Sequence, residues 1–106
     1  MAVKSERPTF IVVGPLTYFI HYDLNSDENY GFTNHEDSSI NLRPDLSPSL
    51  EKETLIHEML HCLWYISGMG EVKKKKEETV VSILSPWVLM FLTNLDNKDF
   101  LKYISK

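Results

Sequence analysis

Residues 47–68, which read SPSLEKETLIHEMLHCLWYISG, decide the fold. They open with Ser47-Pro48, a helix N-cap followed by proline in the first helical position. They close with Gly68, a residue type that commonly ends helices. Apolar residues cover well over half of the circumference of such a helix: Leu55, Ile56, Met59, Leu60, Cys62, Leu63 and Ile66. We expect this helix to end at Ser67. Because a helix that is apolar on so many sides is buried on more than one side, we also expect it to lie between a sheet and further helices.

The residues before this helix predict short strands. β-branched and aromatic residues gather in four runs separated by turn-forming residues: Thr9 to Val13, Leu16 to Leu24, Tyr30 to Thr33 and Ser39 to Leu42. Gly14-Pro15 separates the first two runs, and polar clusters at residues 25–29 and 34–38 separate the others. This pattern predicts a small, mostly antiparallel sheet built from hairpins.

The residues after the helix predict two more helices. Met69 to Lys76 forms a polar, basic connection, and a helix is expected from about Glu77 to Leu95, with Pro86 kinking or interrupting it. Asp96 to Lys106 predicts a short C-terminal helix. Because all strands precede all helices, the sequence indicates an α+β fold, and its 106 residues fit a single domain over 1–106.

Bulk composition narrows the class of protein. The net charge of −4 and the pI of about 5.5 give no reason to expect a nucleic-acid partner. The first residues show no secretory signal, and no apolar run approaches the ~18–20 residues that span a bilayer, so no membrane partner is expected. Cys62 is the only cysteine, which excludes an intrachain disulfide and favours a cytoplasmic, reducing location. The oligomeric state stays open.

The chemistry-bearing motif is His57-Glu58-Met59-Leu60-His61, an H-E-x-x-H pattern inside the predicted helix. Residues four apart project from the same helix face, so the two imidazoles can reach one Zn²⁺ ion. Glu58 lies next to them and is the expected catalytic base, taking a proton from a zinc-bound water and delivering it to the leaving amine. The motif therefore predicts a zinc site with His57 and His61 as metal ligands.

The third protein ligand has to come from elsewhere. A metzincin would continue the motif with a glycine and a third histidine, but Trp64 and Ser67 stand at those positions. A glutamate from the next helix would give a His₂Glu site, and both Glu77 and Glu78 are available.

We prefer Glu78 as the third ligand, with Glu77 as the alternative. The ligand-bearing helix must come close to the motif helix, so small side chains should follow the ligand on its contact face. Ser82 and Ser85 stand four and seven residues after Glu78. The residues at the same spacing after Glu77 are larger and typical of a core: Val81 and Leu84.

Four segments together resemble a known family: residues 30–33, 39–42, 53–61 and 77–81. The chain is similar over roughly residues 30–100 to small zincin-like metallopeptidases of the gluzincin type. Many of these are encoded by phages and mobile elements and are related to the ImmA and IrrE group. The resemblance implies a minimal zincin-like fold, with His57, His61 and Glu78 as zinc ligands and Glu58 as the base. It also implies a protein substrate, such as a host or phage regulator.

The expected function is thus a zinc-dependent metallopeptidase that hydrolyses peptide bonds of a protein or peptide substrate. The alternative is a metal-stabilised, phage-type regulatory or binding protein with little or no hydrolysis; a small helical interaction module without metal is a third. His21 in a strand is expected to be structural or exposed, and His35 in a polar turn is expected to be a surface residue. No tyrosine can be assigned as a transition-state-stabilising donor among Tyr22, Tyr30, Tyr65 and Tyr103.

Overall fold

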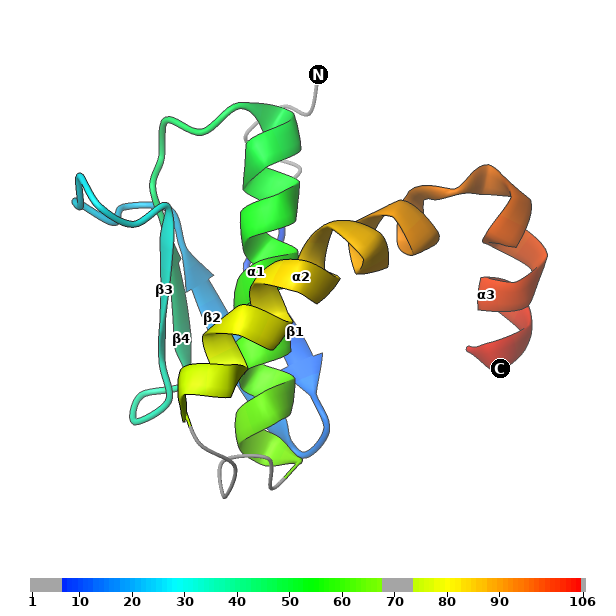
Figure 1. The fold of residues 1–106 in the computed structure, drawn as a ribbon, viewed down its shortest axis with the longest axis horizontal. Helices are drawn as coiled ribbons and strands as arrows, with labels where there is room; N and C mark the ends of the chain where they lie inside the picture. The colour runs from blue at the N-terminus through cyan, green and yellow to red at the C-terminus, as the bar shows by residue number, and fades with distance from the viewer. Residues whose placement is uncertain (1–6, 68–73, 106) are drawn as a thin grey trace.

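A computed structural model describes residues 7–67 and 74–105 of the chain. Its elements are β1 (Phe10–Val13), β2 (Leu16–His21), β3 (Gly31–Asn34), β4 (Ser39–Leu42), α1 (Pro48–Ile66), α2 (Lys74–Thr93), the short 3-10 helix η3 (Leu95–Asn97) and α3 (Lys98–Ile104). Strands come first and helices follow, which confirms the predicted α+β class (Figure 1).

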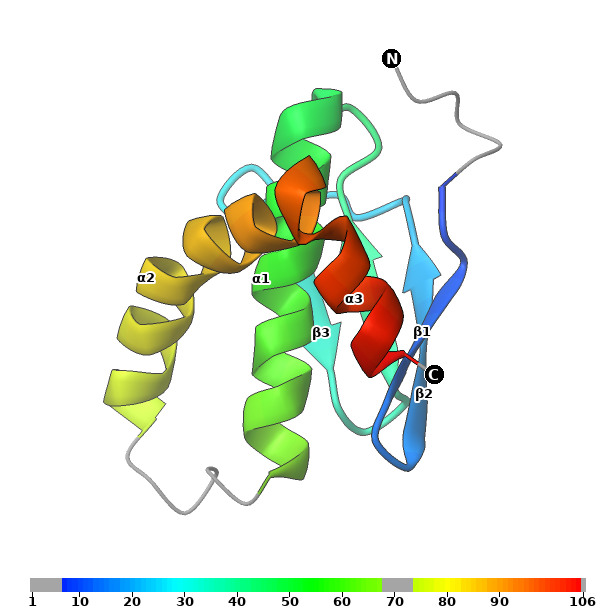
Figure 2. The ribbon, with the colours of Figure 1, turned by 90° about the vertical axis from the view of Figure 1, so that its right-hand side faces the viewer.

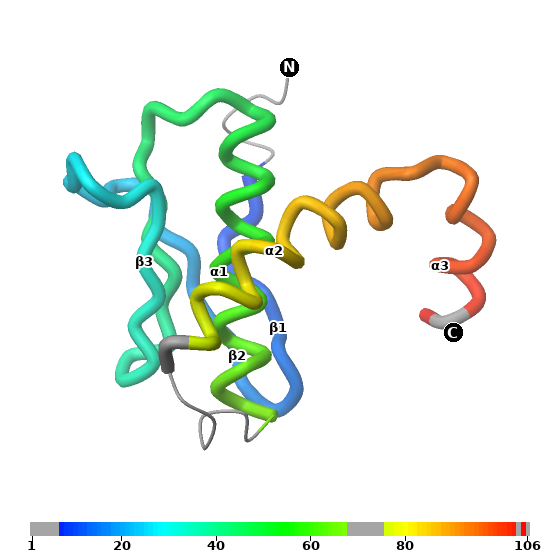
Figure 3. The backbone as a smooth tube through the Cα atoms, in the orientation of Figure 1, coloured from blue at the N-terminus to red at the C-terminus, as the bar shows by residue number. Residues whose placement is uncertain are grey.

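The four strands form one mixed sheet in the order β1-β2-β4-β3. The β1–β2 and β3–β4 pairs are antiparallel hairpins, as predicted, but β2 and β4 pair in parallel, with Ile20 opposite Ile40. Burial explains why β4 rather than β3 takes the inner position: Ile40 and Leu42 of β4 are fully buried, whereas no residue of β3 is. This order leaves β3 as an edge strand beside α1, which the backbone path in Figure 3 makes visible.

The core lies between one face of the sheet and α1. Alternate residues of β2 point inward, so Tyr18 and Ile20 are buried while Phe19 between them is 56% exposed. The remaining core members come from the other strands and from α1: Val13, Ile40, Leu42 and Cys62. An alternating pattern of this kind is what a sheet with one covered face requires.

Helix α1 begins where the sequence predicts. Ser47 is the N-cap and its hydroxyl oxygen accepts a hydrogen bond from the Leu50 amide, with Pro48 in the first turn. The helix ends at Ile66 with Ser67 as the C-cap, and Gly68 lies outside the described residues. Figure 2 shows α1 in the middle, with the sheet on one side and α2 on the other, which confirms its predicted place between two layers.

Helix α2 begins earlier than predicted. Lys74 to Lys76, expected in the connection, form its first turn; the rest of the expected connection, residues 69–73, lies outside the described residues. Of the two outcomes predicted for Pro86, an interruption did not occur, because α2 continues through Pro86 to Thr93. The proline costs the helix one backbone hydrogen bond at this point without ending it.

The chain's last part projects away from the sheet (Figure 1). Phe91 of α2 and Phe100 of α3 pack edge to face with ring centroids 5.8 Å apart. Within the described residues no single helix is long and apolar enough to cross a membrane. Two helical segments, Lys76–Thr93 and Leu95–Tyr103, reach that length and composition only together, and they are bent by 69° at the break between them.

Candidate metal centre

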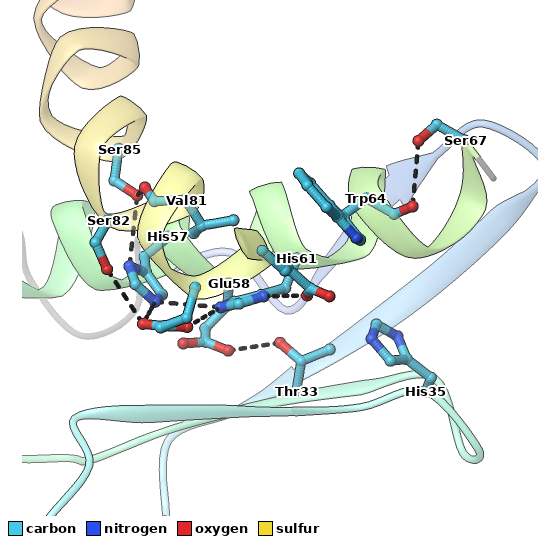
Figure 4. Close-up of polar contacts among 12 residues, drawn as sticks. Thr33, His35, His57, Glu58, His61, Trp64, Ser67, Val81, Ser82 and Ser85 are labelled. Carbon is cyan, nitrogen blue, oxygen red and sulfur yellow. Dashed lines mark hydrogen bonds and ion pairs between the residues drawn. The ribbon is translucent and has the colours of Figure 1, made fainter. Parts of the chain in front are cut away.

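The histidines of the motif face the first turns of α2. His57 and His61 stand one helical turn apart on α1 (Figure 4). Glu77 and Glu78, in the first turns of α2, contact them. Of the two small residues expected at the contact of α2 with α1, Ser85 is 1% exposed and reaches His57. Ser82 is exposed and donates a hydrogen bond to Glu78 of its own helix. The second buried residue of α2 at this contact is Val81, which the sequence pattern places on the face of Glu77.

Three side chains bring possible metal-ligand atoms close together. The Nε2 atoms of His57 and His61 are 3.3 Å apart. The Glu78 carboxylate reaches both of them, with Oε1 3.1 Å from Nε2 of His57 and Oε2 2.9 Å from Nε2 of His61. One ligand atom from each of the three residues lies within 4.8 Å of the others. The side chain of Glu78 is 62% exposed, so the group is open to solvent on one side.

The other ring nitrogens of both histidines have hydrogen-bond acceptors. Nδ1 of His61 lies 2.5 Å from a carboxylate oxygen of Glu77. Nδ1 of His57 lies 3.4 Å from the Ser85 hydroxyl oxygen, whose own hydrogen is donated to the Val81 carbonyl at 2.6 Å. Both acceptors favour the tautomer that carries its hydrogen on Nδ1, which leaves each Nε2 with a lone pair directed at the other.

This arrangement fits a cation. In the tautomer with hydrogens on both Nδ1 atoms, the two Nε2 lone pairs and the Glu78 carboxylate are all acceptors, and a positive charge among them would relieve their repulsion. Two ligands that each bind a tetrahedral Zn²⁺ at ~2.0–2.1 Å are about 3.3 Å apart, which is the observed separation of the Nε2 atoms. Imidazole and carboxylate are also the ligand types that zinc takes in open sites with three protein ligands. His57, His61 and Glu78 could therefore hold such an ion.

Glu58 lies beside this group and is nearly enclosed. It is 6% exposed, and its Oε1 accepts a hydrogen bond of 2.7 Å from the Thr33 hydroxyl of β3. Among the described residues no hydrogen bond engages Oε2, so one oxygen stays available to a further donor. Gly31 makes this closeness of β3 and α1 possible, since a Cβ there would lie 2.8 Å from Cγ2 of Thr54 and 3.2 Å from Cγ of Glu58.

A cavity of about 330 Å³ joins these groups and extends to His35. The expectation that His35 is a surface residue of a polar turn was wrong. It lines the cavity at the end of β3, with Nδ1 2.9 Å from the Tyr18 hydroxyl and its ring stacked on Tyr65 at 4.1 Å. No local signal marks His35 in the sequence, because Tyr18 and Tyr65 meet it only through the parallel pairing of the sheet and the packing of α1.

Two other sequence expectations concern residues near the site. His21 is exposed at the end of β2, as expected. Cys62 is fully buried next to the motif, and this burial raises the pKa of its thiol to about 12, with a smaller contribution from the Glu58 carboxylate. Burial likewise raises the pKa of Tyr18 to about 12. Both groups are therefore protonated at neutral pH, and Cys62 is a small core residue rather than a nucleophile.

Comparisons with protein-family models, with curated proteins and with solved structures found no match for this chain. The chemistry of the site itself therefore indicates what the protein can do.

Proposed function

We propose that the protein is a zinc-dependent metallopeptidase of the zincin type, acting in the cytoplasm on a protein or peptide substrate. The proposal rests on one arrangement: the possible ligand atoms of His57, His61 and Glu78 lie close together beside the buried carboxylate of Glu58. Among the described residues, only one oxygen of that carboxylate accepts a hydrogen bond. A site that only stabilises the fold needs no such carboxylate and is usually closed by a fourth protein ligand.

Each side chain then has a separate task. His57, His61 and Glu78 hold the ion, and Glu77 keeps the His61 ring in the tautomer that can bind it. Zinc held by these three residues would supply a water of lowered pKa, about 7, and a Lewis acid for the carbonyl group. Glu58 accepts the proton of the attacking water through its uncommitted oxygen and transfers it to the nitrogen that leaves as the peptide C–N bond breaks. Thr33 holds the Glu58 carboxylate in place for both transfers.

The edge position of β3 supports a peptide substrate. One side of β3 is paired with β4, and the other side has no partner strand within the described part of the chain. An extended peptide can add to such an edge through main-chain hydrogen bonds. Because Gly31 and Thr33 of this strand line the cavity at Glu58, a peptide on the edge would bring its carbonyl groups to the candidate metal centre.

The decisive experiment compares wild type with Glu58→Gln. Both proteins should bind about one zinc per chain, because Glu58 is not a ligand, and only the wild type should cleave peptides from a digest-derived library. Loss of a general base typically lowers the rate by ~10²–10⁴-fold. Equal cleavage by both proteins would show that Glu58 is not the base. One bound zinc without cleavage would favour the metal-stabilised regulatory or binding protein, and no bound zinc would overturn the proposal.

A further inference from the structure

A second cavity adjoins the candidate metal centre along α1. It has a volume of about 260 Å³ and shares four lining residues with the cavity described above: Asn29, Gly31, His57 and Glu58. It extends from Glu58 toward the N-terminus of α1, whereas His61, Glu77 and Glu78 line only the other cavity. Glu58 therefore lies between two cavities. One is lined by all three candidate metal ligands, and the other is lined by only one of them, His57.

The walls of this second cavity combine apolar surface with acidic groups. Leu50 and Thr54 stand two turns and one turn before Glu58 on the same ridge of α1, and Tyr30 faces them from the segment before β3. Glu53, one turn before His57, and Glu28 add two exposed carboxylates. An apolar wall with carboxylates at its rim matches a lysine or arginine side chain, whose methylene stem packs while its charged end stays near water.

The described residues provide no cation to neutralise these carboxylates. Of the residues that the structure describes, no lysine or arginine lines either cavity. Arg43 lies over the ring of Tyr30 at 5.6 Å, but its guanidinium is bound by both carboxylate oxygens of Asp45, at 3.1 and 2.9 Å. No ion pair engages Glu28 or Glu53 within the described chain. A negative, partly apolar cavity next to the site thus favours a positively charged side chain of the substrate.

We propose that this cavity binds the side chain of the substrate residue that follows the cleaved bond, and that it selects lysine or arginine there. The assignment to this side of the bond rests on the proposed peptidase function. Glu58 must reach the nitrogen that leaves, so the residue carrying that nitrogen sits next to Glu58. The side chain of that substrate residue would then enter the second cavity, which has Glu28 and Glu53 at its rim.

The test uses pairs of acetylated peptides that are identical except for lysine or norleucine after the bond that the wild type cleaves in a degenerate library. The lysine peptide should have a kcat/KM about tenfold higher, and Glu28→Gln with Glu53→Gln should remove most of this preference. Glu36→Gln, which removes the same charge from the exposed β3–β4 turn, should leave it unchanged. Cleavage with no preference for a basic residue, or a preference that survives the double substitution, would overturn the proposal.

A binding measurement separates this inference from the peptidase proposal. Fluorescent acetylated peptide libraries that carry either lysine or norleucine at one fixed position, and that need no prior cleavage to define them, are titrated into zinc-loaded Glu58→Gln protein with and without the double substitution. When the wild type cleaves nothing, selective binding of the lysine library that Glu28→Gln and Glu53→Gln abolish would still support the basic-side-chain site and sink only the peptidase. Equal binding of both libraries in that case would overturn both.

Discussion

Glu77 and Glu78 are neighbours in the chain, yet they meet opposite nitrogens of the same ring. Glu77 approaches Nδ1 of His61 to 2.5 Å, and Glu78 approaches Nε2 to 2.9 Å. The His61 ring is thus held between two consecutive glutamates of α2. One of them is placed to share a metal with the ring, and the other is placed to set the ring's orientation and tautomer.

The two glutamates should therefore differ in their effect on zinc affinity. We expect Glu78→Gln to abolish tight binding, because it removes one of three protein ligands and a negative charge. Glu77→Gln should weaken binding by about 10–100-fold, the typical effect of removing a group that orients a ligand. Competition with a chromogenic chelator measures both values. A larger loss for Glu77→Gln would mean that the ligand and the orienting group have been exchanged.

Zinc should also stabilise the fold. Since the ligands come from two helices, binding holds α1 and α2 together, and zinc at a hundred times its Kd adds about 2.7 kcal/mol. For a domain of this size that corresponds to a rise in Tm of roughly 10–20 °C, which a strong chelator should reverse. His57→Ala should lose this response, whereas His21→Ala, which changes an exposed histidine outside the site, should keep it. An unchanged melting curve in chelator would argue against a bound metal.

Thr33 should act on the rate through Glu58. Thr33→Val removes the hydrogen bond to Oε1 while keeping the shape of the side chain, so the carboxylate loses its anchor. We expect kcat to fall about tenfold, with zinc affinity and KM little changed, since a bond to a charged group is worth ~1.5–3 kcal/mol. Thr33→Ser should restore most of the rate because it keeps the hydroxyl. If serine were as slow as valine, the hydrogen bond alone would not explain the loss, because serine keeps the hydroxyl that valine lacks.

Gly31 should tolerate no side chain. In Gly31→Ala the new Cβ would meet Cγ2 of Thr54 at 2.8 Å and Cδ2 of Leu42 at 2.9 Å, so β3 must move away from α1. Overpacking of this kind typically costs ~1–3 kcal/mol in the free energy of unfolding, which denaturant titration measures. Adding Thr54→Ser removes the closest clash and keeps the hydroxyl bonded to the Leu50 carbonyl, so it should recover part of the loss. If Thr54→Ser recovers none of the lost stability, the contact with Cγ2 of Thr54 is not the main source of the strain.

The sequence by itself determined the elements and the motif. Ser47-Pro48 marks the start of α1, and the wide apolar surface of that helix places it between two layers, because such a surface is stable only when it is covered on both sides. The spacing of His57 and His61 follows from the helical repeat alone. The preference for Glu78 also came from local spacing, but only one of the two serines behind it, Ser85, is buried in the structure, and Ser82 is exposed.

Tertiary structure alone decided which distant residues meet. The parallel pairing of β2 with β4 puts β3 at the edge, and this brings Thr33 to Glu58 and His35 to Tyr18 and Tyr65. Strand order depends on which strand buries more apolar surface against α1, a global comparison that no single segment encodes. For the same reason the sequence offered Glu77 only as an alternative ligand. Its contact with Nδ1 of His61 depends on how α2 is rotated and packed on α1.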